Sequence, residues 1–267
     1  MEDLTRYNPE GSILRKAQHR MLDILQVVDA IFQKHGIEYT LDGGSLLGAV
    51  RHGGFIPWDD DLDINVMRKD VPRIRKILKE ELPANLVYQD YFTDPYYPTL
   101  ILKVRDKHSY IYEEECTDRL QEKGIFIDII PMEEVPNLAW KKKLDYWYGH
   151  CLRGIHHYAD TKDTILSWIV LPFAWCLTVL TRFTNKFRTI DQLAHVYGWA
   201  AYNGFSKKDY YPIKRMPFEG FLACVPNNPD AVLTRLFGDY MQLPPEEKRS
   251  IHSQRIEIYD EDCLSDR

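Results

Sequence analysis

Four aspartates crowd into five positions of the chain, Asp59, Asp60, Asp61 and Asp63, directly before an apolar stretch. So many negative charges in a short segment repel one another unless a cation neutralises them. In an extended strand alternate side chains share a face, so Asp61 and Asp63 point to the same side and Asp59 continues their parity. Mg²⁺ prefers oxygen ligands and completes its shell with water and substrate phosphates. The spacing therefore predicts a divalent metal site, for Mg²⁺ or Mn²⁺, on Asp59, Asp61 and Asp63.

The acidic segment has other interpretations. One is a solvated turn in which Asp59 or Asp60 caps the loop. A twelve-residue calcium loop starting at Asp59 is the other, and it fails. Ile64 would stand where glycine is required, and Asp70 would stand where a bidentate glutamate belongs.

A Gly43-Gly44-Ser45 turn lies shortly before the aspartates. Glycines let a backbone approach a phosphate closely, and the N-terminus of a following helix supplies N–H donors and a favourable dipole. Such a turn alone is weak support, because Gly-Gly-Ser is more often only a turn. Its closeness to the aspartates leads us to expect that Gly43, Gly44 and Ser45 bind a substrate phosphate. Asp42 is expected to cap the helix, with a position facing the site as the alternative.

Asp128 is the single charged residue in the apolar run 125–130. An unpaired charge in an apolar strand costs several kcal/mol unless it is protonated or bound to a cation. We expect Asp128 to be a third metal-site carboxylate or a general base. An ion pair with a neighbouring Arg or Lys is the alternative.

Three cations are candidates for binding phosphate oxygens: Arg51, Lys103 and Arg105. Lys103 and Arg105 alternate in an expected strand, so they share a face. Arg51 lies between the glycine turn and the aspartates. For each of the three, simple solvation at the surface is the alternative.

Composition narrows the class of protein. The chain has 267 residues, long enough for a substantial core, and its formal net charge of −6 gives no general attraction to nucleic acid. Its five cysteines are scattered, without a C-x-x-C pair, which favours a reducing compartment over a disulfide framework or zinc knuckle. The first residues lack the basic and apolar regions of a signal peptide. These features predict a cytoplasmic protein.

An uncharged stretch over 165–180 is the exception to this ordinary composition. It is shorter than the roughly 20 residues that a spanning helix needs, and Pro172 is expected to break it. A buried helix pair is the simplest interpretation. A segment lying in a membrane interface, aided by Trp168 and Trp175, is the alternative, and it would place the protein at the inner face of a membrane.

Apolar periodicity and turn residues predict an α/β (α+β) chain in two parts. We expect a mixed catalytic core over 1–135 and a mostly helical, acceptor-side region packed on it over 136–267. Helices are expected over 12–35, 46–51, 71–82, 138–157, 163–181, 186–201 and 230–238. Strands are expected over 37–42, 62–67, 86–90, 99–105, 110–114 and 125–130.

The sequence resembles the LicD family, which is related to the fukutin group. The resemblance is carried by the block over 41–64, by the Phe-Ile-Asp-Ile-Ile-Pro run over 126–131, by Phe-Glu-Gly over 218–220 and by the segment 237–249. The resemblance implies a nucleotidyltransferase-like mixed sheet flanked by helices. It also implies that Asp61 and Asp63 bind metal, that Ser45 lies at the phosphate and that Asp128 is the third carboxylate. One departure is Asn65-Val66, where the family commonly has Gly-Met.

The resemblance implies transfer of phosphocholine, or of a polyol phosphate, from a CDP-activated donor to a sugar hydroxyl of a glycan. Asp61, Asp63 and Asp128 are then the expected catalytic residues. The partners would be a CDP-alcohol and a glycan or lipid-linked oligosaccharide, with no nucleic acid. Three alternatives stay open: a nucleotidyltransferase that releases pyrophosphate, a D-x-D glycosyltransferase that uses a sugar nucleotide, and a glycan-binding module without catalysis.

Overall fold

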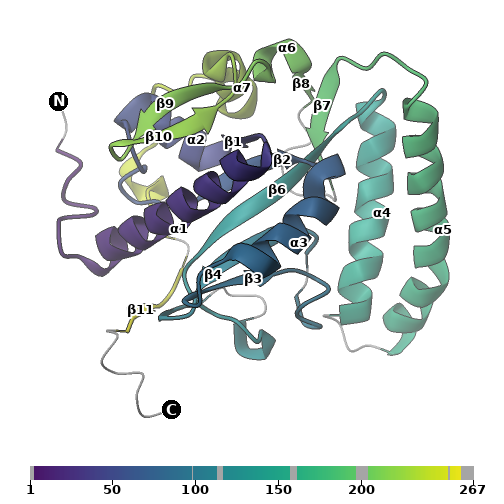
Figure 1. Cartoon of the computed structure of the whole chain (residues 1–267), viewed down its shortest axis with the longest axis horizontal. Coiled ribbons are helices and arrows are strands. Elements are labelled where there is room, and N and C mark those ends of the chain that lie inside the picture. Colours follow the sequence, from purple (N-terminus) through teal and green to yellow (C-terminus); the bar gives the residue numbers. More distant parts are fainter. Residues whose placement is uncertain are drawn as a thin grey trace.

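A mixed seven-stranded sheet forms the centre of the molecule (Figure 1). The structure is a computed structural model. It describes residues 3–97, 99–112, 117–156, 161–196, 204–251 and 253–259. The path across the sheet is β1-β2-β6-β4-β3, and β7 pairs with β6 and with β8. The strands of this sheet are β1 (Tyr39–Leu41), β2 (Asp63–Met67), β3 (Leu86–Gln89), β4 (Leu102–Asp106), β6 (Phe126–Glu134), β7 (Gln192–His195) and β8 (Phe205–Ser206). Only β2 and β6 run parallel; the other pairs are antiparallel.

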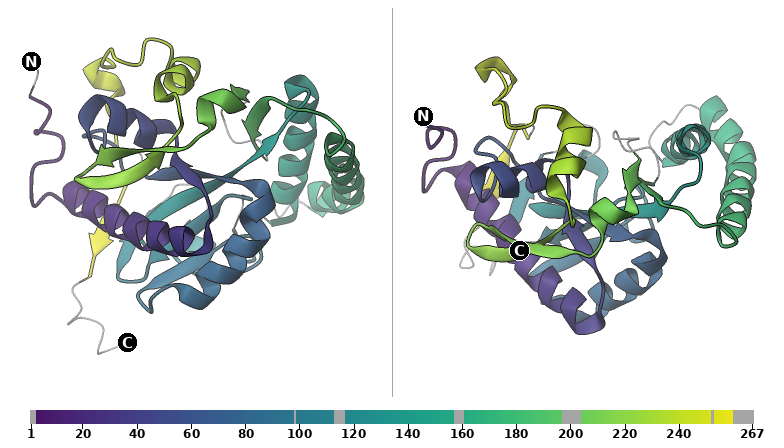
Figure 2. Two further views of the ribbon diagram at one scale, coloured as in Figure 1. Left: turned by 45° about the horizontal axis from the view of Figure 1, so that its top comes forward. Right: turned by 90° about the horizontal axis from the view of Figure 1, so that it is seen from above.

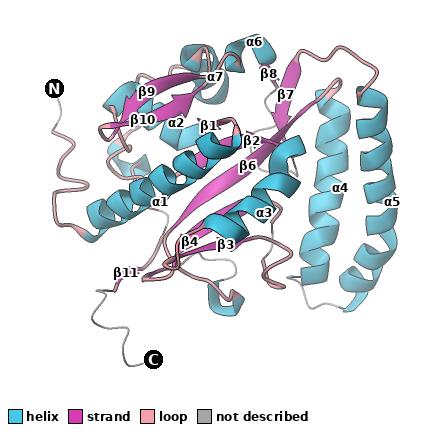
Figure 3. Ribbon diagram, in the orientation of Figure 1, coloured by secondary structure: helices cyan, strands magenta, loops and turns pink. Residues whose placement is uncertain are grey.

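Helices and two small sheets surround this centre (Figure 3). The helices are α1 (Ile13–His35), α2 (Gly43–His52), α3 (Val71–Glu81), α4 (Leu138–His156), α5 (Thr161–Asn185), α6 (Lys207–Tyr210) and α7 (Pro229–Phe237). The small sheets are the hairpin of β9 (Lys214–Phe218) with β10 (Phe221–Val225), and the pair of β5 (Ser109–Ile111) with β11 (Ile256–Ile258).

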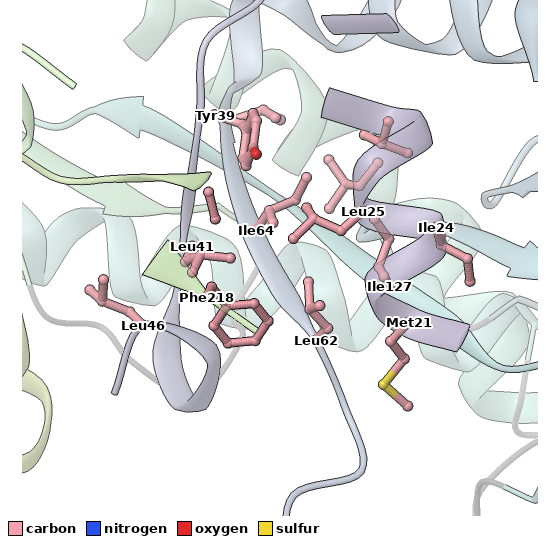
Figure 4. Packing of buried hydrophobic residues seen from close by; sticks show 14 of the residues in the cluster. Met21, Ile24, Leu25, Tyr39, Leu41, Leu46, Leu62, Ile64, Ile127 and Phe218 are labelled. Carbon is pink, nitrogen blue, oxygen red and sulfur yellow. The ribbon is translucent and has the colours of Figure 1, made fainter. Parts of the chain in front are cut away.

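The sheet has one apolar and one polar face in its central strands. Ile64, Val104 and Ile127 are fully buried on the apolar face, in the same core cluster as the buried stripe of α1. In Figure 4, Met21 and Leu25 of α1 lie on one side of this strand layer. Register pairs Val104 with Ile127, and it pairs Ile64 with Ile129, which shares a face with Ile127. The alternate positions of the same strands must therefore face the other way.

Helix α1 has clear start and stop signals. The hydroxyl of Ser12 accepts a hydrogen bond from the Arg15 N–H at 3.2 Å, and Gly36 ends the helix in a left-handed conformation with φ of 61°. Both signals are visible in the sequence, and the predicted helix over 12–35 is confirmed.

A helical hairpin, α4 and α5, stands at the edge of the molecule beyond β6 and β7 (Figures 1 and 2). Glu133, near the end of β6, anchors it. Its carboxylate lies 2.9 Å from Lys141 of α4 and 2.9 Å from Arg182 of α5, and it also pairs with Arg68 at 2.5 Å. One partly buried carboxylate thus holds the ends of both helices against the sheet.

The second part of the chain departs from expectation. The predicted helix over 186–201 is wrong where the structure describes it: Gln192–His195 is strand β7, paired with β6, and residues 197–201 lie outside the described residues. Residues 113–114 of the expected strand over 110–114 also lie outside them. Besides α4 to α7, the part after residue 136 contains β7 to β11, and β7 and β8 continue the sheet of the first part.

The apolar stretch over 165–180 also differs from its simplest interpretation. It belongs to one continuous helix, α5, with Pro172 inside it, rather than to a buried helix pair. Trp168, Phe173 and Trp175 are 61%, 68% and 54% exposed. Among the described residues, no helix is long and apolar enough to cross a membrane.

The Glu133 anchor gives the first prediction. Burial alone would raise the pKa of Glu133, but Lys141, Arg182 and Arg68 lower it to about 2 from its ordinary 4.5. Because the folded-state pKa is depressed, the stabilisation is complete above pH 4.5 and is lost as the pH falls towards 2. Glu133→Gln should weaken the docking of the hairpin by about 3 kcal/mol, because it removes the carboxylate shared by three partly buried cations, of which Lys141 retains Asp145 at 2.6 Å.

Amide hydrogen exchange in α5, compared with that in β2, measures this loss. The exposed Glu80→Gln is the matched control and should leave exchange in α5 unchanged. Unaltered protection of α5 in Glu133→Gln would show that the apolar contacts between the two helices suffice to dock the hairpin.

Candidate active site

Four charged side chains form a row across four neighbouring strands on the polar face of the sheet. Asp63 of β2 is in register with Asp128 of β6, and Asp128 is in register with Lys103 of β4. Asp42 extends β1 to the same level, because its N–H donates to the Asp63 carbonyl at 3.0 Å. Residues in register point to the same face, so backbone pairing alone aligns Asp42, Asp63, Asp128 and Lys103.

The loop before β2 brings further carboxylates to this row. The amide of Gln18, buried in α1, donates to the Asp59 carbonyl at 2.9 Å and so fixes the loop. Asp60 points elsewhere: its carboxylate accepts hydrogen bonds from the backbone N–H of Ser253 at 2.6 Å and from the Ser253 hydroxyl. The Asp60 carboxylate therefore has a partner of its own in Ser253.

Burial and crowding raise the pKa of two carboxyl groups in this cluster. Burial, followed by the negative charges of Asp61 and Asp60, raises the pKa of Asp59 well above its usual range. Burial also raises the pKa of Asp63, and the charges of Asp61 and Asp128 add to this effect. The charged form of these two carboxyl groups is therefore unfavourable unless a proton or a cation neutralises it.

The glycines of α2 leave room for these carboxylates. Gly43 adopts φ of +49°, and a Cβ built on it would lie 3.5 Å from Asp63 Oδ2. A Cβ on Gly44 would lie only 2.6 Å from Asp59 Oδ2, closer than real side-chain contacts allow. The two glycines were expected at a phosphate; the structure places them directly against the acidic cluster, at the N-terminus of α2.

The side chains of Ser45 and Asp42 both contact other residues in or beside the row. The Ser45 hydroxyl accepts the Asp63 N–H at 2.9 Å, so it holds the start of β2, and the residue is buried. Asp42 occupies the N-cap position of α2, but its side chain does not cap the helix as expected. Its Oδ2 instead lies 2.9 Å from the Nε2 of His195.

His195 of β7 is a site residue that sequence reasoning missed. Its Nε2 also lies 3.1 Å from the side-chain oxygen of Asn65, and both residues are buried. Burial alone would raise the pKa of Asp42, but His195 and the Asn65 side chain hold it below its usual range. Asp42 Oδ1 is buried without a hydrogen-bond partner among the described residues. No local pattern around His195 marks it, because its role depends on β7 pairing with β6.

The three expected phosphate-binding cations have different positions. Lys103 Nζ lies 3.0 Å from Asp128 Oδ1 and 3.1 Å from the centre of the Phe126 ring, so Asp128 has the cation partner that was its alternative interpretation. Arg105 shares the face of Lys103, as predicted. It is fully buried and donates to Gln89 Oε1 at 2.5 Å and to the Gly124 carbonyl at 2.8 Å. Its described bonds therefore hold the interior together, away from the acidic row.

Arg51 is not brought to the cluster. It lies near the far end of α2, about 12 Å along the helix axis from Gly43 at 1.5 Å per residue. Its guanidinium donates to the Tyr240 carbonyl at 2.7 Å and so fastens a C-terminal loop to α2.

Comparison with known proteins assigns this arrangement to a family. Residues 36–148 match the model of the LicD/FKTN/FKRP nucleotidyltransferase domain. This range contains β1 to β6, α2 and α3, and with them every residue of the acidic row and Lys103. This segment of the chain is a LicD-type nucleotidyltransferase domain.

Relatives of the chain include proteins whose names state an activity. The lipopolysaccharide cholinephosphotransferase LicD of Haemophilus influenzae is 27% identical over 90% of the chain and 95% of that protein. The ribitol 5-phosphate transferase FKRP of Homo sapiens is 50% identical over 44 residues, which are 16% of the chain and 9% of that protein. An uncharacterised protein of Rickettsia prowazekii is 34% identical over 33% of the chain and 32% of its own length.

The donor set of this LicD-family site suits a hard divalent cation. All its acidic groups offer carboxylate oxygens, and the buried Asp42 Oδ1 lacks a partner among the described residues. Within the described part of the chain, no three His, Cys, Asp or Glu side chains are placed so that they could together hold a metal ion. Mg²⁺ requires no such set of three, because it is commonly bound through one or two carboxylates, water and substrate phosphates.

Metal binding at the LicD-family site is testable through Asp63. We expect Asp63→Asn to weaken Mn²⁺ binding at least about tenfold, because a neutral amide replaces one of the crowded carboxylates. Isothermal titration with MnCl₂ in the presence of CDP measures the affinity. Asp60→Asn is the control: its amide oxygen still accepts from Ser253, and binding should persist. Equal affinity in the two variants would place the metal elsewhere.

The glycine contact gives a separate prediction. Gly44→Ala should displace the Asp59 carboxylate, since the new methyl group would lie within 2.6 Å of its oxygen. We expect weaker Mn²⁺ binding with little change in melting temperature, because alanine is favoured over glycine in a helix. Unchanged Mn²⁺ affinity in a folded variant would show that Asp59 takes no part in the site.

Proposed function

We propose that the chain transfers a phospho-alcohol group, phosphocholine or a polyol phosphate, from a CDP-activated donor to a sugar hydroxyl of a glycan. The observation that carries this proposal is the row of Asp42, Asp63, Asp128 and Lys103 on four adjoining strands. The match to the LicD/FKTN/FKRP domain supports it, and so do the activities in the names of the Haemophilus influenzae and Homo sapiens relatives, a cholinephosphotransferase and a ribitol 5-phosphate transferase.

Asp61 and Asp63, with Asp59 and Asp128 close by, would hold the divalent cation. Bound Mg²⁺ or Mn²⁺ would neutralise charge on the donor diphosphate. The N-terminus of α2 at Gly43 and Gly44 faces the same cluster and would favour an anionic donor group through its N–H dipoles.

The reaction would proceed by in-line displacement at phosphorus. The acceptor hydroxyl oxygen forms a bond to the phosphorus of the phospho-alcohol, and the bond from that phosphorus to the bridging oxygen of the diphosphate breaks, releasing CMP. Asp128 would accept the hydroxyl proton. Lys103, which lies 3.0 Å from Asp128, would neutralise the phosphoryl oxygens as charge shifts to CMP.

His195 would act on this chemistry through Asp42. Its Nε2 lies 2.9 Å from one oxygen of Asp42. This contact would orient the Asp42 carboxylate and hold the end of β1 beside Asp63. A cytoplasmic location, with the acceptor glycan carried on a lipid at the inner face of a membrane, fits this proposal.

A panel of donors tests the proposed reaction. CDP-choline, CDP-ribitol and CDP-glycerol are incubated with MnCl₂ and a glycan acceptor, and release of CMP is measured. We expect CMP from at least one CDP-alcohol, a loss of at least about 10³-fold in Asp63→Asn, and near-normal turnover in Asp60→Asn.

The same panel separates the alternatives. Release of pyrophosphate from labelled CTP or ATP would indicate a nucleotidyltransferase, and release of UDP from UDP-sugars a glycosyltransferase. Glycan binding that is independent of metal, with no nucleotide released from any donor, would indicate a binding module.

A further inference from the structure

Helix α5 presents an unusually wide apolar surface. Between Ile165 and Phe183, the exposed side chains that the structure describes are all uncharged: Ile165, Trp168, Ile169, Pro172, Phe173, Trp175, Cys176, Leu177, Val179, Leu180 and Phe183. We call this set the α5 face. Monomeric proteins in water rarely expose so large a continuous apolar patch. The α5 face therefore requires something to cover it.

Among the α5 side chains whose burial the structure describes, few are fully covered by the rest of the chain. Ala174 and Thr178 are buried, and they are four residues apart, as expected for one line of contact along a helix. Arg182 continues this line and pairs with Glu133 at 2.9 Å. Figure 2 shows α4 and α5 standing beside the sheet, with the rest of the molecule on one side of them.

One end of the hairpin combines aromatic and basic side chains. Phe187, just after α5, is 76% exposed, and Lys186 and Arg188 on either side of it are exposed. Lys143 of α4 is exposed near the beginning of that helix, which Glu133 holds beside the end of α5. Among the side chains over 138–190 that the structure describes, Asp145 alone is acidic. It is buried, and its Oδ2 lies 2.6 Å from the Nζ of Lys141.

Among the described side chains of this hairpin, the exposed charge is thus positive, although the whole chain has a formal net charge of −6. Basic side chains beside an apolar helix face complement a surface that is apolar inside and anionic at its rim. Tryptophan, here Trp168 and Trp175 on α5 with Trp140 and Trp147 exposed on α4, is favoured where hydrocarbon meets headgroups.

We infer that the α4–α5 hairpin docks on the surface of an anionic lipid bilayer, with the α5 face in the interface and Lys143, Lys186 and Arg188 at the headgroups. The helix lies along the surface and does not cross it. This inference goes beyond the proposed reaction, and it can be tested without donor or acceptor.

Flotation with vesicles tests the inference on the full chain. Vesicles of phosphatidylcholine alone, or with phosphatidylglycerol, are mixed with the protein and separated on a density gradient. We expect the chain to float with the anionic vesicles and its tryptophan emission to shift to shorter wavelength. Raised salt should weaken binding, because headgroup attraction to exposed cations is screened.

Two pairs of variants locate the contact. Phe173→Glu with Leu180→Glu, at positions 68% and 59% exposed, should weaken binding at least about tenfold, whereas Leu222→Glu, 54% exposed on β10, should not. Lys143→Glu with Lys186→Glu should also weaken binding about tenfold or more, and Lys76→Glu with Lys208→Glu is its charge-matched control. Unchanged Mn²⁺ binding in all variants shows that they fold.

Three results would overturn the inference. The first is that the intact chain does not float with anionic vesicles. The second is that Phe173→Glu with Leu180→Glu binds the vesicles as tightly as the unaltered chain does. The third is that the chain forms a dimer without vesicles, which Phe173→Glu converts to a monomer. The last result would assign the α5 face to a second copy of the chain. Donor turnover is independent of all three, so failure of the membrane inference would leave the proposed reaction intact.

Discussion

The parallel pairing of β2 with β6 is the constraint on which the site depends. It places Asp63 and Asp128 side by side, at positions 65 residues apart in the sequence, and the neighbouring strands extend the row to Asp42 and Lys103. Three carboxylates on one sheet face repel each other, and the burial that separates them from water increases that repulsion. The apolar face beneath, packed against α1, stabilises the sheet that keeps them together.

Local patterns in the sequence predicted much of the first part of the fold. Cap residues and apolar periodicity located α1, and alternation located β2 and β4, because these elements are specified by neighbouring residues. The fold class, a mixed sheet flanked by helices, is confirmed. Strand β7 was mistaken for helix because its four residues gain their strand character from pairing with β6, which periodicity does not report.

For the candidate site, residue type and spacing predicted the cluster of aspartates, but they did not predict the contacts that the surrounding residues make. Asp60 is bound by Ser253, whereas the face shared by Asp59, Asp61 and Asp63 stays a prediction. The environments of Arg51 and Arg105 depend on segments distant in sequence, namely the loop at Tyr240 and the backbone at Gly124. His195 was missed for the same reason. The metal ligands and their metal stay predictions.

Two contacts at the C-terminal end of the chain have a consequence for biosynthesis. Arg51 of α2 donates to the Tyr240 carbonyl, and Asp60 of the acidic loop accepts from Ser253, so each segment is supported by a residue that lies 189 or 193 positions later in the chain. While the ribosome still holds those later residues, α2 and the acidic loop each lack one of these supports. The acidic loop is thus secured by Ser253 only long after the loop itself has left the ribosome.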